Sequence, residues 1–235
     1  MERLDKFISS QSGLSRKQAR DRIWRGAVTV NGKVEKLIDR KVDPEKDEIL
    51  LDGHSVTYRE YLYIMMNKPQ GYVSASRDRD EKTVLDLLPP EFARSGLFPA
   101  GRLDKDTEGL LIITDDGEFS HKMLAPGKEV YKTYIAQLDG PVTSEQADAF
   151  RKGITLSSGE QCLPATIEDI GDNLARIRIC EGKYHQVKRM CAATGRKVLA
   201  LRRVSIGALQ LDETLASGEC RLLSEDELCK LLKNS

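Results

Sequence analysis

A glycine-bounded loop that leads directly into an apolar run is the feature of this sequence that most restricts its fold. Residues 101–110 read Gly-Arg-Leu-Asp-Lys-Asp-Thr-Glu-Gly-Leu, and residues 110–113 are all aliphatic. A short apolar run bounded by turn residues is typical of a buried strand. Glycine at both ends lets the backbone turn sharply and approach a ligand closely. The segment therefore predicts a turn that presents polar side chains beside a core strand.

Asp104 is the candidate functional group of this loop. Arg102 and Lys105 flank it in the sequence, and a carboxylate between two cations is expected to stay ionised. An ionised carboxylate is what a nucleophile or a general base requires. A solvated ion pair without a function is the competing interpretation. Asp106, two residues on, is the competing carboxylate, although a local hydrogen-bonding role suits it better.

Positive charge is concentrated in two segments of a chain whose formal net charge is zero. Residues 1–33 contain eight Lys or Arg and three Asp or Glu, and residues 176–203 contain nine and one. Basic blocks within a neutral chain are typical of a phosphate-binding surface. Ordinary solvated faces are the alternative interpretation.

The composition offers no pattern for a metal site, a disulfide framework or a membrane segment. The five cysteines are odd in number and none form a Cys-x-x-Cys pair. The first residues contain no apolar signal region, and no run approaches the length needed to cross a bilayer. We therefore expect a cytoplasmic protein that needs neither a metal nor a cofactor.

The first sixty residues predict a small helix–hairpin module. A helix is expected to start at Ser15, with Gln18 completing a capping box, and to stop at Gly26. Residues 28–30 predict a strand that enters a tight turn at Asn31-Gly32. The helix carries most of the basic residues of the first block. This module therefore has the composition of a nucleic-acid-binding domain.

Strand and helix signals alternate through the remainder of the chain. Strands are expected near residues 61–66, 110–114, 130–138 and 173–180, a helix at 184–194, and further helices after Asp116, Thr143 and Ser224. We therefore expect an α+β protein with two domains. The small domain spans residues 1–58, and a larger domain with an antiparallel or mixed sheet spans residues 61–235.

Four segments, in the same order, resemble the motifs of the RNA pseudouridine synthases. They are the Asn-Lys-Pro-Gln-Gly of residues 67–71, the Arg-Leu-Asp loop of 101–110, the Lys-Thr-Tyr of 132–134 and the Gly-Lys-Tyr-His-Gln-Val-Lys-Arg-Met of 182–190. Together they cover nearly the whole chain, which makes the match specific. The first module resembles the S4 RNA-binding domain.

The resemblance implies that the protein isomerises uridine to pseudouridine after the target base leaves the RNA stack. It implies that Asp104 acts on the target nucleotide, either as a nucleophile or by abstracting a proton from the ribose. Lys188 would be its basic partner, and Tyr134 would stack on the extruded base. Arg102 would contact the RNA and could fill the space that the base leaves.

The remaining motif residues are expected to bind RNA phosphates. They are Arg16, Lys17, Arg20 and Arg25 in the first module, and Lys132, Lys183 and Arg189 in the larger domain. Lys183 stands where the family often has arginine, so planar bidentate contact with phosphate is lost there. We interpret His185 as a structural hydrogen-bonding residue at a helix start rather than as an acid or base.

Within the family, the layout most resembles the branch that modifies the small-subunit (16S) ribosomal RNA of bacteria. The expected partner is 16S rRNA or a partly assembled small ribosomal subunit, and the protein is expected to act as a monomer. Two alternatives stay open. One is the same reaction on 23S rRNA, and the other is a non-catalytic S4-type factor that binds RNA during ribosome assembly.

Overall fold

The chain forms two compact units in a computed structural model that describes residues 1–125 and 130–231. One unit contains residues 1–62 and 88–97, and the other contains residues 63–87 and those from 98 onward. Residues 126–129 and 232–235, which belong to the expected larger domain, lie outside the described ones. Within the described ranges, no helix has both the length and the apolar character needed to cross a membrane.

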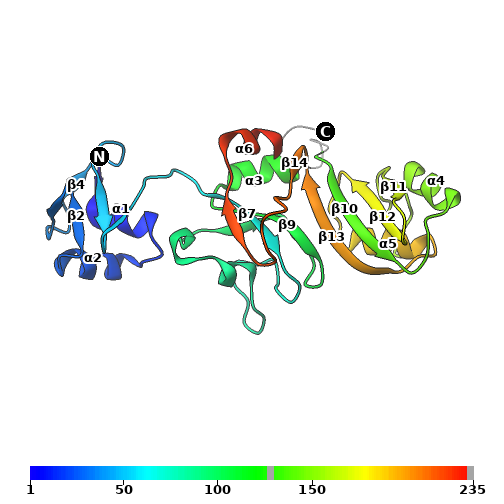
Figure 1. Cartoon of the computed structure of the whole chain (residues 1–235), viewed down its shortest axis with the longest axis horizontal. Coiled ribbons are helices and arrows are strands. Elements are labelled where there is room, and N and C mark those ends of the chain that lie inside the picture. Colours follow the sequence, from blue (N-terminus) through cyan, green and yellow to red (C-terminus); the bar gives the residue numbers. More distant parts are fainter. Residues whose placement is uncertain (126–129, 232–235) are drawn as a thin grey trace. The chain divides into compact units, whose positions relative to one another are not determined.

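The first unit combines helices with very short strands (Figure 1). Its elements are β1 (Glu2–Arg3), α1 (Leu4–Gln11), α2 (Arg16–Trp24), β2 (Val28–Val30), β3 (Lys33–Val34), β4 (Lys41–Val42), β5 (Ile49–Leu51), β6 (His54–Ser55) and the 3-10 turn η2 (Pro90–Phe92). Strands β3, β2, β5 and β6 form a four-stranded sheet in that order, and β1 pairs with β4. This arrangement agrees with the expected α+β module.

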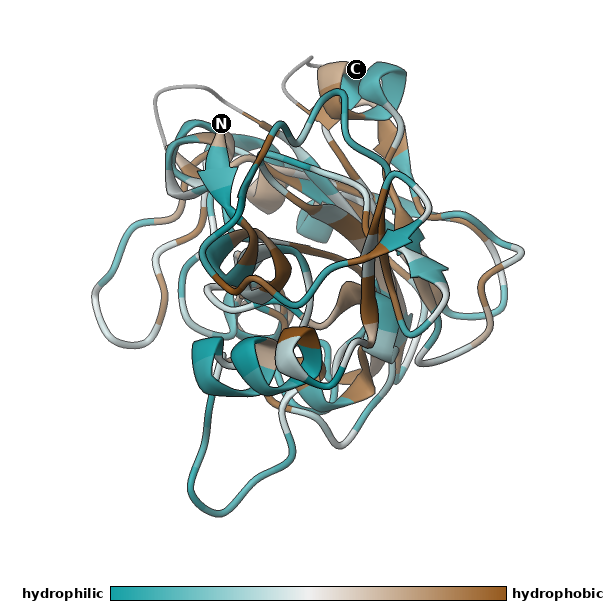
Figure 2. Cartoon of the chain, turned by 90° about the vertical axis from the view of Figure 1, so that its left-hand side faces the viewer, coloured by the Kyte–Doolittle hydropathy of each residue, from teal (hydrophilic) through white to brown (hydrophobic). Residues whose placement is uncertain are grey.

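Local hydrogen bonds fix the ends of these elements. The capping box at the start of α2 is confirmed, because Ser15 Oγ accepts from the Gln18 N–H at 3.3 Å and Gln18 Oε1 accepts from the Ser15 N–H at 2.8 Å. Asn31 and Gly32 both have positive φ, as a two-residue hairpin requires. Only Ala19 and Ile23 of α2 are buried, and its ribbon is mostly hydrophilic (Figure 2).

The second unit is built on a nine-stranded sheet. Its strands are β7 (Tyr63–Lys68), β8 (Phe98–Ala100), β9 (Glu108–Thr114), β10 (Lys132–Leu138), β11 (Thr166–Asp169), β12 (Leu174–Ile179), β13 (Val198–Ile206), β14 (Leu209–Gln210) and β15 (Cys220–Leu222). The main order is β11-β12-β10-β13-β9-β7-β15, with β14 on β13 and β8 on β9. The β9–β13 pair is parallel and the other described pairs are antiparallel, so the sheet is mixed.

Helices cover both ends of this sheet. They are α3 (Gly117–Leu124), α4 (Ser144–Lys152), α5 (Gln186–Ala193) and α6 (Glu225–Leu231), with a 3-10 turn η1 (Val84–Leu87). Helices α3 and α6 share a core with β7 and β9 (Figure 1), which includes Met65, Leu110, Met123 and Leu231. Helix α4 packs against β11, and α5 packs against β13. The core therefore holds the middle of the sheet rigid.

One helix start follows Thr143 as expected but has a different capping pattern from that at Ser15, and another helix start differs from the expectation. Thr143 accepts from the Gln146 N–H, but the Gln146 side chain donates to Thr194 Oγ1 at 2.9 Å instead of returning to the cap. The capping box at Thr143 is therefore only half formed, because a tertiary partner competes for the amide. Helix α5 begins at Gln186 rather than at Tyr184, because His185 has a left-handed backbone with φ 48°.

Gly109 allows the parallel strands to meet. Its φ is +101°, and a Cβ at this position would lie 2.2 Å from the carbonyl oxygen of Arg203 on β13. The close approach that the sequence indicated is therefore made to the protein's own backbone rather than to a ligand. It joins β9 to β13 directly after the loop that contains Asp104.

Gly109→Ala is expected to lower the free energy of unfolding by about 2–5 kcal/mol, because the side chain adds both backbone strain and a clash. Gly171→Ala is the matched control, since Gly171 has φ +90° but no atom within 4 Å of the added Cβ. The control should lose only about 1–2 kcal/mol. Urea denaturation of both variants measures the difference, and equal losses would contradict the role given to the close strand contact.

Candidate active site

The buried side chain of Lys68, at the end of β7, hydrogen-bonds to the backbone of the loop that contains Asp104. Lys68 is 0% exposed, and its Nζ donates to the carbonyl oxygens of Pro69 at 3.0 Å, Asp104 at 3.0 Å and Thr107 at 2.9 Å. An ammonium has three donors, so this group is fully satisfied. The loop backbone is thereby fixed next to its carboxylate.

Side-chain and backbone hydrogen bonds complete the anchoring of the loop. Ser74 Oγ donates to the carbonyl oxygen of Leu103 at 2.8 Å and accepts from its N–H at 3.1 Å. The Gly71 N–H donates to the carbonyl oxygen of Lys105 at 2.8 Å. Both donors belong to the segment that follows Lys68. The Asn-Lys-Pro-x-Gly motif therefore serves as the support of the Asp104 loop.

The Asp104 carboxylate faces the start of α5. Lys188 Nζ lies 3.0 Å from Asp104 Oδ2 and 2.5 Å from Asp106 Oδ1. His185 Nε2 lies 3.5 Å from Asp104 Oδ1. The side chain of Asp104 is 25% exposed, so a ligand can reach it, whereas that of Asp106 is 71% exposed. The position of Lys188 beside Asp104 is the one that the motif resemblance implied.

The cations next to Asp104 in the sequence do not pair with it. Lys105 Nζ lies 2.7 Å from Glu81 Oε2. Arg102 is exposed, and its side chain has no ion pair among the described residues. The flanking cations therefore form no ion pair with the carboxylate, because a loop turns successive side chains in different directions. The pairing cation is Lys188, which is more than eighty positions away.

Asp106 and Lys188 shift each other's pKa. The hydrogen bond from Lys188 is the main reason that the pKa of Asp106 lies below its usual range. Burial opposes the charged form of Lys188, but hydrogen bonds to Asp106 and Asp104 outweigh it and raise the pKa of Lys188. A lysine shared between two carboxylates thus stays charged at neutral pH.

Tyr134 lies on β10 beside β13, with little of its ring accessible. Its residue is 7% exposed, and the guanidinium carbon of Arg203 is 6.0 Å from the ring centroid. Arg203 is 3% exposed, its Nε donates to the carbonyl oxygen of Leu110 at 2.8 Å, and its Nη2 has no partner among the described residues. A buried unpaired donor beside an aromatic ring is costly unless a ligand uses it.

Lys132, expected to contact RNA, is buried instead. It is 6% exposed, and its Nζ donates to the carbonyl oxygen of Val130 at 3.1 Å. Burial, and then the charge of Arg203, lower the pKa of Lys132. Strand alternation explains the placement, because residues 132 and 134 face the same side of β10. A surface contact between Lys132 and a phosphate is therefore not supported.

Lys183 and Arg189 hold the start of α5 in place. Lys183 Nζ lies 3.4 Å from Glu160 and 3.6 Å from Glu181, and Arg189 Nη1 lies 3.2 Å from Glu160. Arg189 Nη2 also donates to Ser158 Oγ at 2.7 Å. Both cations, expected to bind phosphates, are thus engaged within the unit. Their observed contacts are structural ones.

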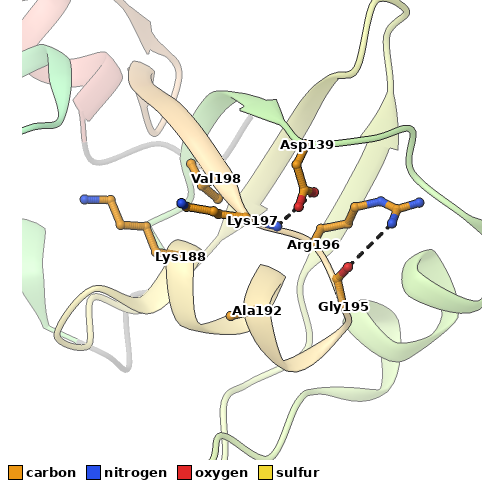
Figure 3. A pocket seen from close by; sticks show the side chains of 7 residues that line it. All are labelled: Asp139, Lys188, Ala192, Gly195, Arg196, Lys197 and Val198. Atoms are coloured by element: carbon orange, nitrogen blue, oxygen red, sulfur yellow. Dashed lines mark hydrogen bonds between the residues drawn. The ribbon is translucent and has the colours of Figure 1, made fainter.

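A shallow groove of about 370 Å³ is lined by Lys188 and Ala192 of α5, by Asp139 and by residues 195–198. Figure 3 shows the side chains of Lys188 and Lys197 directed to one side of it and that of Arg196 to the other. The Lys197 N–H donates to Asp139 Oδ1 at 3.0 Å, and Arg196 Nε donates to the carbonyl oxygen of Pro141 at 2.9 Å. The groove therefore extends the cationic surface of the active site.

In the first unit, a buried carboxylate gathers three arginines. Asp5 has a side chain that is 0% exposed, and Arg3, Arg16 and Arg20 lie 3.0, 3.4 and 2.8 Å from it. Burial opposes the charged form, but the hydrogen bonds from Arg3, Arg20 and Arg16 outweigh it and hold the pKa of Asp5 well below its usual range. The three guanidiniums remain about half exposed and carry a net positive charge.

The other two basic residues expected to bind RNA in this unit lie at the surface. Arg25 Nε pairs with Asp21 at 3.0 Å, and Lys17 is exposed without an ion pair among the described residues. An exposed ion pair of this kind contributes little to stability. Lys17 and Arg25 therefore remain accessible to a phosphate.

Sequence reasoning missed three groups that build the active site. The sequence identifies Lys68 only as part of its motif, Arg203 only as one charge of a basic block, and His185 only as a structural residue at a helix start, whereas its Nε2 lies 3.5 Å from Asp104. Lys68 and Arg203 could have been found from the apolar runs that surround them, because a cation inside a buried strand needs a specific partner. Within residues 1–125 and 130–231, no group of His, Cys, Asp or Glu has a metal-binding arrangement.

Comparison with known proteins gives consistent matches. The family model described as RNA pseudouridylate synthase matches residues 62–193, and the S4 domain model matches residues 2–49. The chain is 44% identical to the uncharacterized RNA pseudouridine synthase YtzG of Bacillus subtilis, over 96% of both chains. It is 43% identical to the ribosomal small subunit pseudouridine synthase A of Escherichia coli K12, over 98% of this chain and 100% of that one. A solved pseudouridylate synthase matches with TM-score 0.69 and 41% identity, covering 98% of this chain and 100% of that one.

The buried Lys68 predicts how stability depends on pH. Burial is the largest effect on it and lowers its pKa from 10.5 to about 8. Below pH 8 both folded and unfolded states hold the proton, and the folded state bears the full cost of the buried charge. Between pH 8 and 10.5 only the unfolded state keeps the proton, so this group makes the free energy of unfolding rise with pH.

Lys68→Met should remove that rise. We expect urea denaturation at pH 7 to 10 to show the wild type gaining stability over the variant as pH increases above about 8. The variant should also be less stable at pH 7, because three loop carbonyls lose a donor. A stability difference that is constant across this pH range would contradict the assigned titration.

Proposed function

The chain belongs to the RNA pseudouridylate synthase family and is an isomerase, and on that basis we propose that it converts a specific uridine of 16S ribosomal RNA to pseudouridine. The observation that carries the proposal is the Asp104 carboxylate, accessible on an anchored loop and 3.0 Å from Lys188 Nζ. The S4 domain supplies RNA binding. Relatives named as ribosomal small subunit synthases match over nearly their full length, which favours the 16S target.

Isomerisation requires the base to be detached and turned. The C1′–N1 bond breaks with its electron pair on the uracil, and C5 then bonds to C1′ while C5 loses a proton and N1 gains one. We propose that the target nucleotide is flipped out to reach Asp104, at a cost of about a few kcal/mol. As the C1′–N1 bond breaks, Asp104 either bonds to C1′ and is displaced when C5 bonds there, or accepts the C2′ proton and returns it when the new bond forms. Tyr134 would support the detached ring, since stacking of a base on an aromatic ring is worth about 1–3 kcal/mol.

Asp104 is a better candidate than Asp106 for this role. The carbonyl oxygen of Asp104 accepts from both Lys68 Nζ and the Thr107 N–H, so its Cα is fixed. Reacting groups must be held close to their target, and a fixed backbone provides that. Asp106 is mostly exposed and makes its contact through Lys188. We therefore assign Asp106 the role of orienting Lys188.

RNA binding would involve both units. We propose residues 1–58 as the RNA-binding domain, with Arg16, Lys17, Arg20 and Arg25 on phosphates, and residues 61–235 as the catalytic domain. Phosphate contacts position a nucleic acid without reading its sequence. In the catalytic domain, we propose that Arg102 contacts the RNA beside Asp104. The cationic groove at Arg196 and Lys197 would bind phosphates of the RNA next to the target nucleotide.

Asp104→Asn is expected to lower the rate of pseudouridine formation by at least about a thousandfold, because the loss of an essential carboxylate removes the chemical step. RNA affinity should stay within about twofold of wild type, since the charge lost is negative. Asp106→Asn, which removes only the contact that orients Lys188, should lower the rate by less than about fivefold, because Asp104 still pairs with Lys188. Carbodiimide adduct mapping on unmodified rRNA measures the rates of both variants, and a binding assay with the same rRNA measures their affinity. An active Asp104→Asn protein would refute the mechanism.

The choice of 16S rRNA is tested in cells that lack this protein. Pseudouridine mapping of both ribosomal RNAs should show that one 16S position has lost its modification while all 23S positions keep theirs. Re-expression of the wild-type chain should restore that position, and the Asp104→Asn chain should not. Loss of a 23S site instead would reassign the substrate and leave the chemistry unchanged.

A further inference from the structure

Tyr184 presents an exposed aromatic ring beside the catalytic loop. The residue is 71% exposed, and its ring stacks on that of His185 with a centroid distance of 3.8 Å and an interplanar angle of 19°. Building on the proposed function, we infer that the Tyr184–His185 stack is a binding platform for an unpaired nucleobase that neighbours the target uridine in the RNA. A large exposed aromatic ring in a cationic setting is the usual element of single-strand binding sites.

The platform is directly connected to the reacting group. His185 Nε2 lies 3.5 Å from Asp104 Oδ1, so the ring at one end of the two-ring stack contacts the carboxylate. The other end is the outer face of Tyr184. Lys188 follows within one turn of α5 and carries its charge to the same carboxylate. A base on Tyr184 would therefore lie next to the nucleotide on which Asp104 acts.

The rings are held in an unusual conformation. His185 has φ 48° and ψ 34°, a left-handed backbone that is uncommon for a residue other than glycine. Such conformations persist where the surrounding contacts enforce them, often at ligand sites. Here the Gln186 side chain accepts from the Lys183 N–H at 3.0 Å, and Arg189 donates to the Tyr184 carbonyl oxygen at 3.1 Å. The stack is thus prearranged before RNA binds.

Geometry favours a neighbouring base over the target base. A reacting sugar must approach the carboxylate within about 3–3.5 Å. The carboxylate contacts the His185 ring, and the Tyr184 ring lies 3.8 Å from that ring in the stack, so a base on the outer face of Tyr184 is one further stacking distance away. That position is too remote for the target and suits an adjacent nucleotide. The target base is left for the position on Tyr134 that the proposed function gives it.

The Tyr184 hydroxyl and the Tyr184 ring predict different results. If the ring binds a base, Tyr184→Ala should weaken the affinity for unmodified 16S rRNA by about tenfold, within the range known for base stacking. Tyr184→Phe keeps the ring and should bind within about twofold of wild type. Ile170→Ala, at a half-exposed apolar residue of the same unit, is the control and should bind as wild type does.

A mutant cycle with abasic RNA identifies the partner. Synthetic RNA around the target uridine would be made with a single abasic nucleotide at each of the neighbouring positions in turn. At one position the abasic nucleotide should weaken wild-type binding about as much as Tyr184→Ala does and should not weaken that variant further. Losses that multiply at every position would overturn the inference. So would a Tyr184→Ala protein that binds as wild type, or a Tyr184→Phe protein that binds as weakly as Tyr184→Ala.

Effects of the substitutions on folding and on catalysis can be told apart from their effects on RNA binding. Thermal unfolding of the variants should match wild type, because an exposed side chain contributes little to the core. Binding is measured at equilibrium and does not depend on turnover. A wild-type protein that binds rRNA but forms no pseudouridine would contradict the proposed function and leave the cycle interpretable. A wild-type protein that is active but shows no coupling would contradict only the platform.

Discussion

The conformation of the active-site loop depends on the hydrogen bonds that the buried ammonium group of Lys68 donates to it. This group is buried at the end of β7 and donates to carbonyl oxygens on both sides of the Asp104 loop. Removing a charge from water is costly, and the hydrogen bonds of a buried lysine offset that cost while they fix the backbone that accepts them. Strands β7 and β9 pair in the sheet, and the hydrogen bonds of Lys68 join the backbone of the polar Asp104 loop to the end of β7. The carboxylate thus gains a fixed position without being buried itself.

Convergence of distant segments then gives the loop its chemistry. Gly109 lets β9 approach β13 closely, and this parallel junction places the Asp104 loop next to the strands that carry Tyr134 and Arg203. Lys188 arrives from α5, which packs against β13. Three sequence segments therefore meet at one place because a single strand pair is parallel within an otherwise antiparallel sheet. The position of the site follows from the topology of the sheet.

Local patterns in the sequence predicted what local physics controls. The capping box of Ser15 and Gln18 and the Asn31-Gly32 turn involve neighbours, so their hydrogen bonds can be inferred directly. Ion-pair partners could not be inferred in this way. Lys105 pairs with Glu81 and not with the adjacent Asp104, because partners across a loop are set by tertiary packing. The motif resemblance placed Lys188 near Asp104, which no spacing rule would have done.

Basic residues of the motifs divide into those that build the fold and those that remain accessible. Lys183 and Arg189 are engaged by Glu160, and Lys132 lies in the interior, so a count of positive charge overstates the RNA-binding surface. Direct contact requires side chains that can reach the ligand, as Arg102 can. An exposed aromatic ring such as that of Tyr184 can stack on a base without any charge, so the proposed base platform does not depend on unpaired cations.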